Sequence, residues 1–111
     1  MQRGEVWRVR LPPAAGRTQA GERPAVVIQN EPFLTSLPTV LIVPFTSKLA
    51  ARRFAGTLVI QPDVQNGLSA PSVALVFQLS AQDKRNFLYR LGELDSQSMD
   101  QILVMVKQLT L

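Results

Sequence analysis

Residues 24–45 read PAVVIQNEPFLTSLPTVLIVPF, and this stretch decides the class of fold. Two apolar, β-branched runs, AVVIQ and TVLIVPF, have the composition of buried strands. The nine residues between them, NEPFLTSLP, are rich in turn formers and leave room for one helical turn at most. Parallel strands need a crossover of about a dozen residues or more, usually a helix, so the stretch favours an antiparallel sheet. We expect the second strand to stop near Pro44.

The rest of the chain repeats this pattern of short strands separated by turns. EVWRVRL at 5–11 alternates apolar and charged residues, which is typical of a half-buried strand. TLVIQ at 57–61 and SVALVFQL at 72–79 are further apolar runs, and we predict the second to be one strand of at least six residues. After a turn that Asp83 is suited to cap, YRLGEL at 89–94 alternates like a closing strand. The chain is therefore predicted to hold five or six short strands.

The final segment, DSQSMDQILVMVKQLTL at 95–111, is predicted to form an amphipathic helix with Asp95 as its N-cap. Apolar residues recur at the spacing of one helix face, namely Met99, Ile102, Leu103, Val106 and Leu109. We expect this face to pack against the sheet or against a second chain. The predicted fold is mainly β (α+β): one domain over residues 1–111, built as a small, strongly bent antiparallel barrel with a C-terminal helix.

The charge of the chain points to an anionic partner. Its formal net charge is +4, and residues 1–55 hold eight basic but only three acidic side chains. A basic half of this kind suits nucleic acid. Net charge also simply keeps a small protein in solution, so charge alone leaves both interpretations open.

Cysteine and histidine are both absent from the sequence. Without cysteine, disulfides and thiolate chemistry are excluded. Without histidine, catalysis has to proceed without the usual acid and base near neutral pH, and a zinc site would lack its usual ligand. No apolar run approaches the ~20 residues of a membrane span, and the first residues lack the apolar core of a secretory signal. We therefore expect a cytoplasmic protein with no membrane contact.

Four segments occur in an order and spacing that resembles the MazF/PemK family of bacterial toxin endoribonucleases. They are RGEVWRV from Arg3, GERPAVVIQN from Gly21, VPFTSK from Val43 and GLSAPSVALVFQ from Gly67. The most specific parts are the motifs G-x-RP-x-VV, P-x-TS and SV-x-x-x-x-Q in this order. The resemblance covers nearly the whole chain, and it implies an SH3-like, CcdB-like barrel that works as a homodimer.

The same resemblance implies a function and its partners. The chain would be the toxin of a type II toxin–antitoxin system that cleaves single-stranded mRNA by attack of the 2′-OH, with no metal and no cofactor. RNA would lie across the face of the dimer. The C-terminal segment of a cognate, MazE-like antitoxin would occupy that same face.

The resemblance also implies roles for particular residues. Arg23 of the GxRP motif and Thr46 of the P-x-TS motif would be catalytic and act on the scissile phosphate. Ser47 and the strand glutamine Gln78 would support the site. The proline- and glycine-rich segment from Pro12 to Glu22 corresponds to the loop that flanks the pocket. This segment contributes three candidate RNA-binding residues, namely Arg17, Thr18 and Gln19.

The chemistry of these residue types suits a phosphate group. Arginine presents a planar fork that matches phosphate oxygens and stays protonated throughout. A threonine hydroxyl at a strand end can donate or accept a hydrogen bond at the same phosphate. Pro24 restricts the backbone of Arg23 to extended conformations, which helps to aim the guanidinium. A structural role for Arg23, paired with a carboxylate or a carbonyl, remains the alternative.

The sequence departs from the family pattern where many members carry charged groups. Phe77 stands where many have an acid before the glutamine, and Ser80 where many have an arginine. The stretch GRTQAG lacks the Glu, sometimes preceded by His, that many carry in the loop. The general base is therefore not identified, since arginine is a poor base. Glu22 is a candidate, although a loop glutamate beside an arginine is more often part of a solvated ion pair.

Three further basic residues are Lys48, which ends the VPFTSK segment, and Arg52 and Arg53, which come shortly after it. With an RNA substrate they are predicted to contact phosphates, which would steepen the salt dependence without setting sequence choice; otherwise they form a solvated loop. Gln78 could instead satisfy backbone groups inside an apolar strand. Two other functions remain open, namely a CcdB-like toxin that poisons DNA gyrase and a catalytically weak RNA-binding member. The GxRP and TS motifs together favour the nuclease.

Overall fold

The computed structural model describes residues 1–12 and 21–111, so the candidate residues Arg17, Thr18 and Gln19 lie outside the described residues. The strands are β1 (Glu5–Leu11), β2 (Gly21–Val27), β3 (Thr39–Thr46), β4 (Thr57–Ile60), β5 (Ser72–Leu75), β6 (Ser80–Asp83) and β7 (Phe87–Glu93). The helical elements are the 3-10 turns η1 (Glu31–Phe33), η2 (Leu49–Arg53), η3 (Val76–Gln78) and η4 (Lys84–Asn86), and the helix α1 (Ser96–Thr110).

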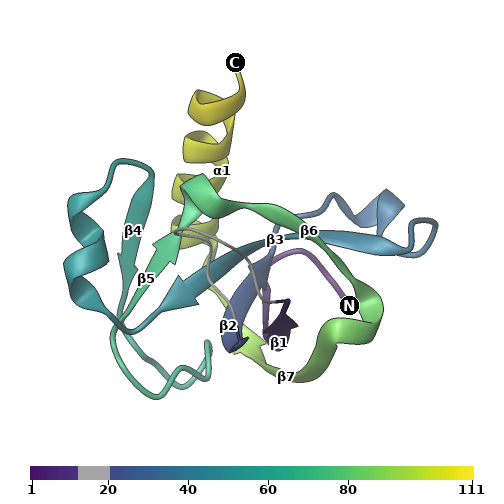
Figure 1. Cartoon of the computed structure of the whole chain (residues 1–111), viewed down its shortest axis with the longest axis horizontal. Helices are drawn as coiled ribbons and strands as arrows, with labels where there is room; N and C mark the ends of the chain where they lie inside the picture. Colours follow the sequence, from purple (N-terminus) through teal and green to yellow (C-terminus); the bar gives the residue numbers. More distant parts are fainter. Residues whose placement is uncertain (13–20) are drawn as a thin grey trace.

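Every pair of neighbouring strands in the described chain is antiparallel, as predicted. The order is β4-β5-β3-β2-β1-β7, and β6 also pairs with β3. The long strand β3 crosses the sheet, with β6 along its first half and the β4–β5 hairpin at its far end (Figure 1). Among the described strands β4, β6 and β7 each have one partner, so the sheet is a bent, barrel-like layer that does not close.

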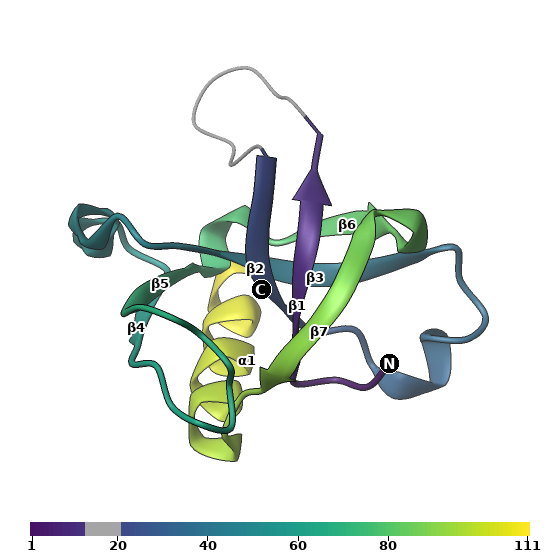
Figure 2. The same ribbon diagram turned by 90° about the horizontal axis from the view of Figure 1, so that it is seen from below.

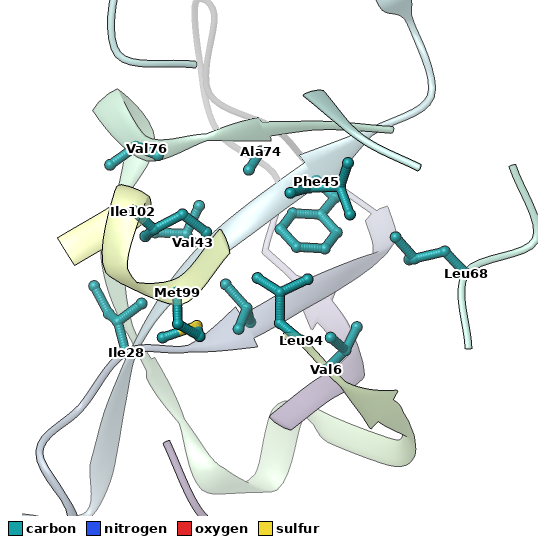
Figure 3. Close-up of a cluster of buried hydrophobic side chains, with 12 residues drawn as sticks. Val6, Ile28, Val43, Phe45, Leu68, Ala74, Val76, Leu94, Met99 and Ile102 are labelled. Carbon is teal, nitrogen blue, oxygen red and sulfur yellow. The ribbon is translucent and has the colours of Figure 1, made fainter. Parts of the chain in front are cut away.

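The bend creates two hydrophobic cores, and β3 contributes to both. Val43 and Phe45 belong to the larger core, whereas Val40 and Ile42 belong to the smaller one. Figure 3 shows the larger core, in which Ile102 of α1 packs among side chains of the strands. All five residues are fully buried. Because side chains alternate along a strand, one short apolar run supplies both cores.

The run SVALVFQL is not one strand, so the prediction of a strand of at least six residues is wrong. β5 ends at Leu75, and the turn η3 carries Gln78 before β6 begins at Ser80. Both strands pair with the same edge of β3, and the break between them lies across from Pro44. Proline has no N–H to donate to a ladder, which favours an interruption at this place. The break explains why the described chain has seven strands rather than five or six, and it removes Gln78 from the strand.

β2 begins at Gly21, four residues before the apolar run that was predicted to form it. Glu22 and Arg23 are therefore strand residues, and the prediction of Glu22 as a loop residue is wrong. Backbone pairing with β1 continues through both residues, so the strand extends beyond its buried part. In the same way β3 continues two residues past Pro44 and ends at Thr46.

Helix α1 begins after Asp95, as predicted, and lies beside the β4–β5 end of the sheet (Figure 2). The Asp95 carboxylate accepts a hydrogen bond from the backbone N–H of Ser98 at 2.9 Å. This bond holds the pKa of the carboxyl below its usual value. Met99 and Ile102 are buried, but Leu109 is 48% exposed, so the sheet covers only part of the predicted apolar face. No helix of the described residues is long and apolar enough to cross a membrane.

Removing the cap of α1 should destabilise the fold in a pH-dependent way. We expect Asp95→Ala to lower the free energy of unfolding by about 1 kcal/mol at neutral pH, as measured by urea denaturation. The folded-state pKa of Asp95 lies below its usual 3.8. Its contribution is therefore fully present above that value and is lost as the pH falls through the folded-state pKa, so the variant and the wild type should converge in acid.

Asp100→Ala provides the matched control, because Asp100 is an exposed residue of the same helix and does not cap it. This variant should change the free energy of unfolding by less than about 0.5 kcal/mol. Equal losses for the two variants would contradict the role of Asp95 as the cap.

Candidate functional site

The central feature of the site is the point where β2 and β3 stop pairing. Their ladder ends with Ala25 opposite Pro44. Continued by two residues, the same antiparallel register would set Arg23 opposite Thr46. Pro24, the next residue of β2, has no backbone N–H to give to β3, so the ladder lacks a donor here. The two strands therefore separate where the GxRP and P-x-TS motifs meet.

A hollow of about 260 Å³ opens at this point. Its lining comes from β1, from the separating ends of β2 and β3, and from the segment that connects β4 with β5. The lining residues are Arg8, Glu22, Arg23, Pro24, Phe45, Thr46, Ser47, Leu68, Ser69, Ala70 and Ser72. The fold thus brings the predicted GERP and FTS segments together in one cavity.

Arg23 places in this hollow a guanidinium whose Nε atom lacks a hydrogen-bond partner among the described residues. Its Nε atom is buried and makes no hydrogen bond within the described part of the chain. A buried donor that lacks an acceptor costs about 1–3 kcal/mol, and buried polar groups in proteins nearly always have a partner. An unsatisfied guanidinium N–H beside an open hollow is therefore suited to an anionic ligand.

The hollow carries a net positive charge because its carboxylate is already paired. Nε of Arg8 lies 3.7 Å from a carboxylate oxygen of Glu22. The ion pair expected for Glu22 is thus present, but its partner is Arg8 rather than Arg23. Sequence reasoning missed Arg8, because strand alternation indicated only that its side chain points away from the core. The sequence held no signal that this face turns toward the site.

Thr46 is a buried polar residue of the hollow, with 3% of its surface exposed at the last position of β3. Its Oγ1 atom accepts a hydrogen bond from the backbone N–H of Lys48 at 3.2 Å. This bond uses the hydroxyl as an acceptor and leaves its proton for donation to a ligand. Ser47 follows at the exposed end of the strand and lines the same hollow.

The segment between β4 and β5 is held in place by the buried side chain of Asn66. Its Oδ1 atom accepts hydrogen bonds from the backbone N–H groups of Asp63, at 3.1 Å, and Leu68, at 2.9 Å. Its Nδ2 atom donates to the carbonyl oxygen of Gln61 at 2.9 Å. Ser69, which sequence reasoning did not select, lines the hollow directly after this anchored turn. Turn-rich composition indicated a loop but not which residues face the site.

A second hollow, of about 350 Å³, adjoins the first and shares Thr46 with it. Its lining residues are Thr46, Lys48, Ala50, Ala51, Arg53, Phe54, Leu75, Phe77 and Gln78. Three of the predicted residues that lie outside the first hollow, Lys48, Arg53 and Gln78, therefore line this one. Arg52 is exposed and lines neither of the two.

A larger hollow, of about 540 Å³, lies at the start of α1 and has the opposite charge. Glu93, Asp95 and Asp100 line it together with a single cation, Arg3. Three carboxylates against one guanidinium disfavour an anionic ligand. Among the described residues no three acidic side chains gather closely enough to hold a metal ion. Electrostatics therefore favour the two hollows at Thr46 for an anion.

Residues 2–110 match the family described as PemK-like, MazF-like toxins of type II toxin–antitoxin systems. The chain belongs to this family. Curated relatives include the endoribonuclease EndoA of Bacillus subtilis, which is 28% identical over 92% of this chain and 87% of its own length. The endoribonuclease MazF of Staphylococcus saprophyticus is 29% identical over 92% of this chain and 84% of its own. These matches give no support to a gyrase-poisoning toxin.

Solved structures show the same fold at lower sequence identity. A crystal structure of MazF from Deinococcus radiodurans matches with a TM-score of 0.82 and 22% identity, over 98% of this chain and 94% of that one. An endoribonuclease from a mycobacterial species, in complex with its cognate antitoxin, matches with a TM-score of 0.77 and 18% identity, over 98% and 93% of the two chains. The bent antiparallel sheet with a C-terminal helix is therefore the family fold.

The anchor of the β4–β5 segment gives a stability prediction. Asn66→Ala removes three side-chain hydrogen bonds from a buried position, so we expect the free energy of unfolding to fall by about 2 kcal/mol or more in urea denaturation. Asn30→Ala is the matched control, because Asn30 is exposed and its side chain does not cap the turn that it precedes. The control should stay within about 0.5 kcal/mol of the wild type, and a similar loss in both variants contradicts the anchoring role.

Proposed function

We propose that this family member acts in the cytoplasm as an endoribonuclease that cleaves single-stranded RNA at the hollow between β2 and β3. The observation that carries the proposal is the buried Nε atom of Arg23, which has no partner among the described residues and belongs to a side chain that lines a cavity together with Thr46. Two curated relatives that are named endoribonucleases support the same activity.

The proposed reaction begins when the 2′-OH next to the scissile phosphate attacks phosphorus. The 2′-OH loses its proton to water as it attacks, and the bond to the 5′ oxygen of the next nucleotide breaks. That oxygen takes up a proton from water and leaves as a 5′-hydroxyl, and the upstream product keeps a 2′,3′-cyclic phosphate. Negative charge develops on the non-bridging oxygens as the bond to the 2′ oxygen forms. The guanidinium of Arg23 stabilises this charge by donating hydrogen bonds, and it stays protonated throughout.

Neighbouring side chains complete the proposed site. Thr46 donates its hydroxyl proton to the same phosphate, because its oxygen already accepts the N–H of Lys48. Ser47 offers a second hydroxyl at the end of the strand. Glu22 supports the site by holding Arg8 in an ion pair at 3.7 Å, so we assign it a positioning role rather than the role of general base.

Basic and polar residues outside the first hollow are assigned to the rest of the RNA. Lys48, Arg52 and Arg53 contact flanking phosphates, and Gln78 contacts the nucleotide beside the cut. The segment before β2 supplies three further RNA contacts, namely Arg17, Thr18 and Gln19. Phosphate contacts add affinity that falls with salt, whereas base contacts set the sequence that is cut.

The proposed partners are a second copy of the chain and a cognate, MazE-like antitoxin. Apolar side chains near the end of α1 support a homodimer, since Val104 is 55% and Leu109 48% exposed. A MazE–MazF crystal structure from Deinococcus radiodurans has the same fold, with a TM-score of 0.73. RNA lies across the dimer face in this proposal, and the antitoxin covers that face to block cleavage.

Arg23→Ala should abolish cleavage while the protein stays folded and dimeric. We expect the rate on a defined RNA to fall by at least about 10²–10³-fold, because a preorganised donor to the developing charge is lost. Cut sites and end groups are mapped on that RNA in EDTA, and the wild type should leave 2′,3′-cyclic phosphate ends.

Arg85→Ala is the control for loss of a positive charge. Arg85 is exposed, pairs with Asp83 and lines neither hollow at Thr46. This variant should cleave at nearly the wild-type rate. Near-normal cleavage by Arg23→Ala, or intact RNA with the wild type over a broad range of sequences and pH, would overturn the proposal.

Thr46→Ala should slow cleavage by more than about tenfold through the loss of a hydroxyl donor. Single-turnover rates on the same RNA provide the measurement. Thr46→Ser keeps the hydroxyl and the acceptor for Lys48, so it should recover most of the rate. If the alanine variant cleaves like the wild type, the donor to the phosphate is another group.

A further inference from the structure

The second hollow has an aromatic wall that the proposed phosphate chemistry does not use. Phe54 and Phe77 lie with their ring centroids 5.7 Å apart and their planes at 55°. Phe77 is 37% exposed, although it is a large apolar side chain. An exposed ring inside a hollow leaves apolar surface in water, and covering that surface with a ligand is favourable.

The ring of Phe77 is held in position by its backbone. The N–H of Phe77 donates to the carbonyl oxygen of Gly56 at 3.2 Å, which ties η3 to the turn before β4. Gly56 has φ +73, and a Cβ atom there would lie 3.3 Å from Cβ of Phe77. Glycine thus permits this close approach as well as the left-handed backbone. The aromatic wall is therefore built into the fold before any ligand arrives.

The remaining lining indicates which ligand fits. Lys48 and Arg53 are cations, and no carboxylate lines this hollow. The guanidinium carbon of Arg53 lies 4.6 Å from the centre of the Phe54 ring. Gln78 adds a polar amide to the lining. An aromatic face, an amide and a positive rim match an unpaired nucleobase on its phosphate backbone better than an apolar peptide side chain.

We propose that Phe54 and Phe77 form a nucleobase-binding subsite, on which a base next to the scissile phosphate stacks. Thr46 lines both hollows, so a phosphate at Arg23 places a neighbouring nucleotide within reach of the aromatic wall. Stacking supplies affinity for any base. The inference rests on the proposed function for the position of the cut phosphate.

A binding experiment on a mapped cut site tests the subsite. A 2′-deoxynucleotide at the cut removes the attacking hydroxyl, so the RNA binds the folded, dimeric protein without being cleaved. In a set of derivatives of this RNA, each member lacks the base of one nucleotide on either side of the cut. Dissociation constants for each RNA are measured by fluorescence anisotropy with the wild type, Phe77→Leu and Phe77→Tyr.

Phe77→Leu should weaken binding of the intact RNA by roughly 5- to 150-fold, the range for one stacked base. On the RNA that lacks the stacked base, the variant and the wild type should bind equally, because the interaction is already absent. Phe77→Tyr keeps the ring and should bind like the wild type. Phe33→Leu is the matched control, since Phe33 is 47% exposed on η1 and lies outside the hollow.

Two results would overturn the subsite. One is that the intact RNA binds Phe77→Leu as tightly as it binds the wild type. The same conclusion follows if Phe77→Leu binds every base-lacking RNA more weakly than the wild type by the same factor, whichever base is missing. The other is a variant that binds RNA normally but has lost affinity for an antitoxin peptide, which would assign the hollow to an apolar side chain.

The same measurements separate the subsite from the proposed function. If the wild type cleaves RNA and Phe77→Leu behaves like it, the subsite is wrong and the nuclease stands. If the wild type cuts no RNA, the proposed function fails, and binding is compared on an unstructured RNA and its abasic derivatives. A loss of affinity that occurs only when the base at particular positions is missing then supports the subsite by itself. If the protein binds no RNA, both the subsite and the proposed function are overturned.

Discussion

The site depends on where the ladder between β2 and β3 ends. Ala25 pairs with Pro44, and Pro24, the next residue of β2, provides no N–H group to extend the ladder. The strands separate at the two positions that the register would otherwise set opposite each other, Arg23 and Thr46. A backbone constraint therefore creates the cavity and supplies its two principal groups from segments that lie far apart in sequence.

The charged residues around this opening have different roles. Glu22 neutralises Arg8, so the carboxylate of the hollow does not pair with Arg23. The guanidinium of Arg23 keeps a buried donor for a ligand. The rings of Phe54 and Phe77, which we propose to bind a nucleobase, line the adjoining hollow. In the proposed function, phosphate chemistry and base recognition occupy adjoining hollows that meet at Thr46.

Local patterns in the sequence predicted most of the elements, but they missed β6 and the ends of β2 and β5. Alternation and capping placed β1 and α1 correctly, because both are set by neighbours a few residues away. The 3-10 turn inside SVALVFQL was missed, since its cause is Pro44 on another strand. Glu22 was expected to pair with the arginine beside it, but it pairs with Arg8 on the neighbouring strand, because a cross-strand register is not visible in a single chain segment. Phe77 stood out only as a departure from the family pattern, and its pairing with Phe54 required the fold.

The most direct test of the central claim is a crystal structure of the protein with an RNA whose attacking 2′-OH is replaced by hydrogen. A non-bridging oxygen of the scissile phosphate should lie about 2.7–3.2 Å from Nε of Arg23 and within hydrogen-bond distance of Oγ1 of Thr46. A phosphate bound elsewhere, with the guanidinium of Arg23 paired to a carboxylate of the protein, would contradict it.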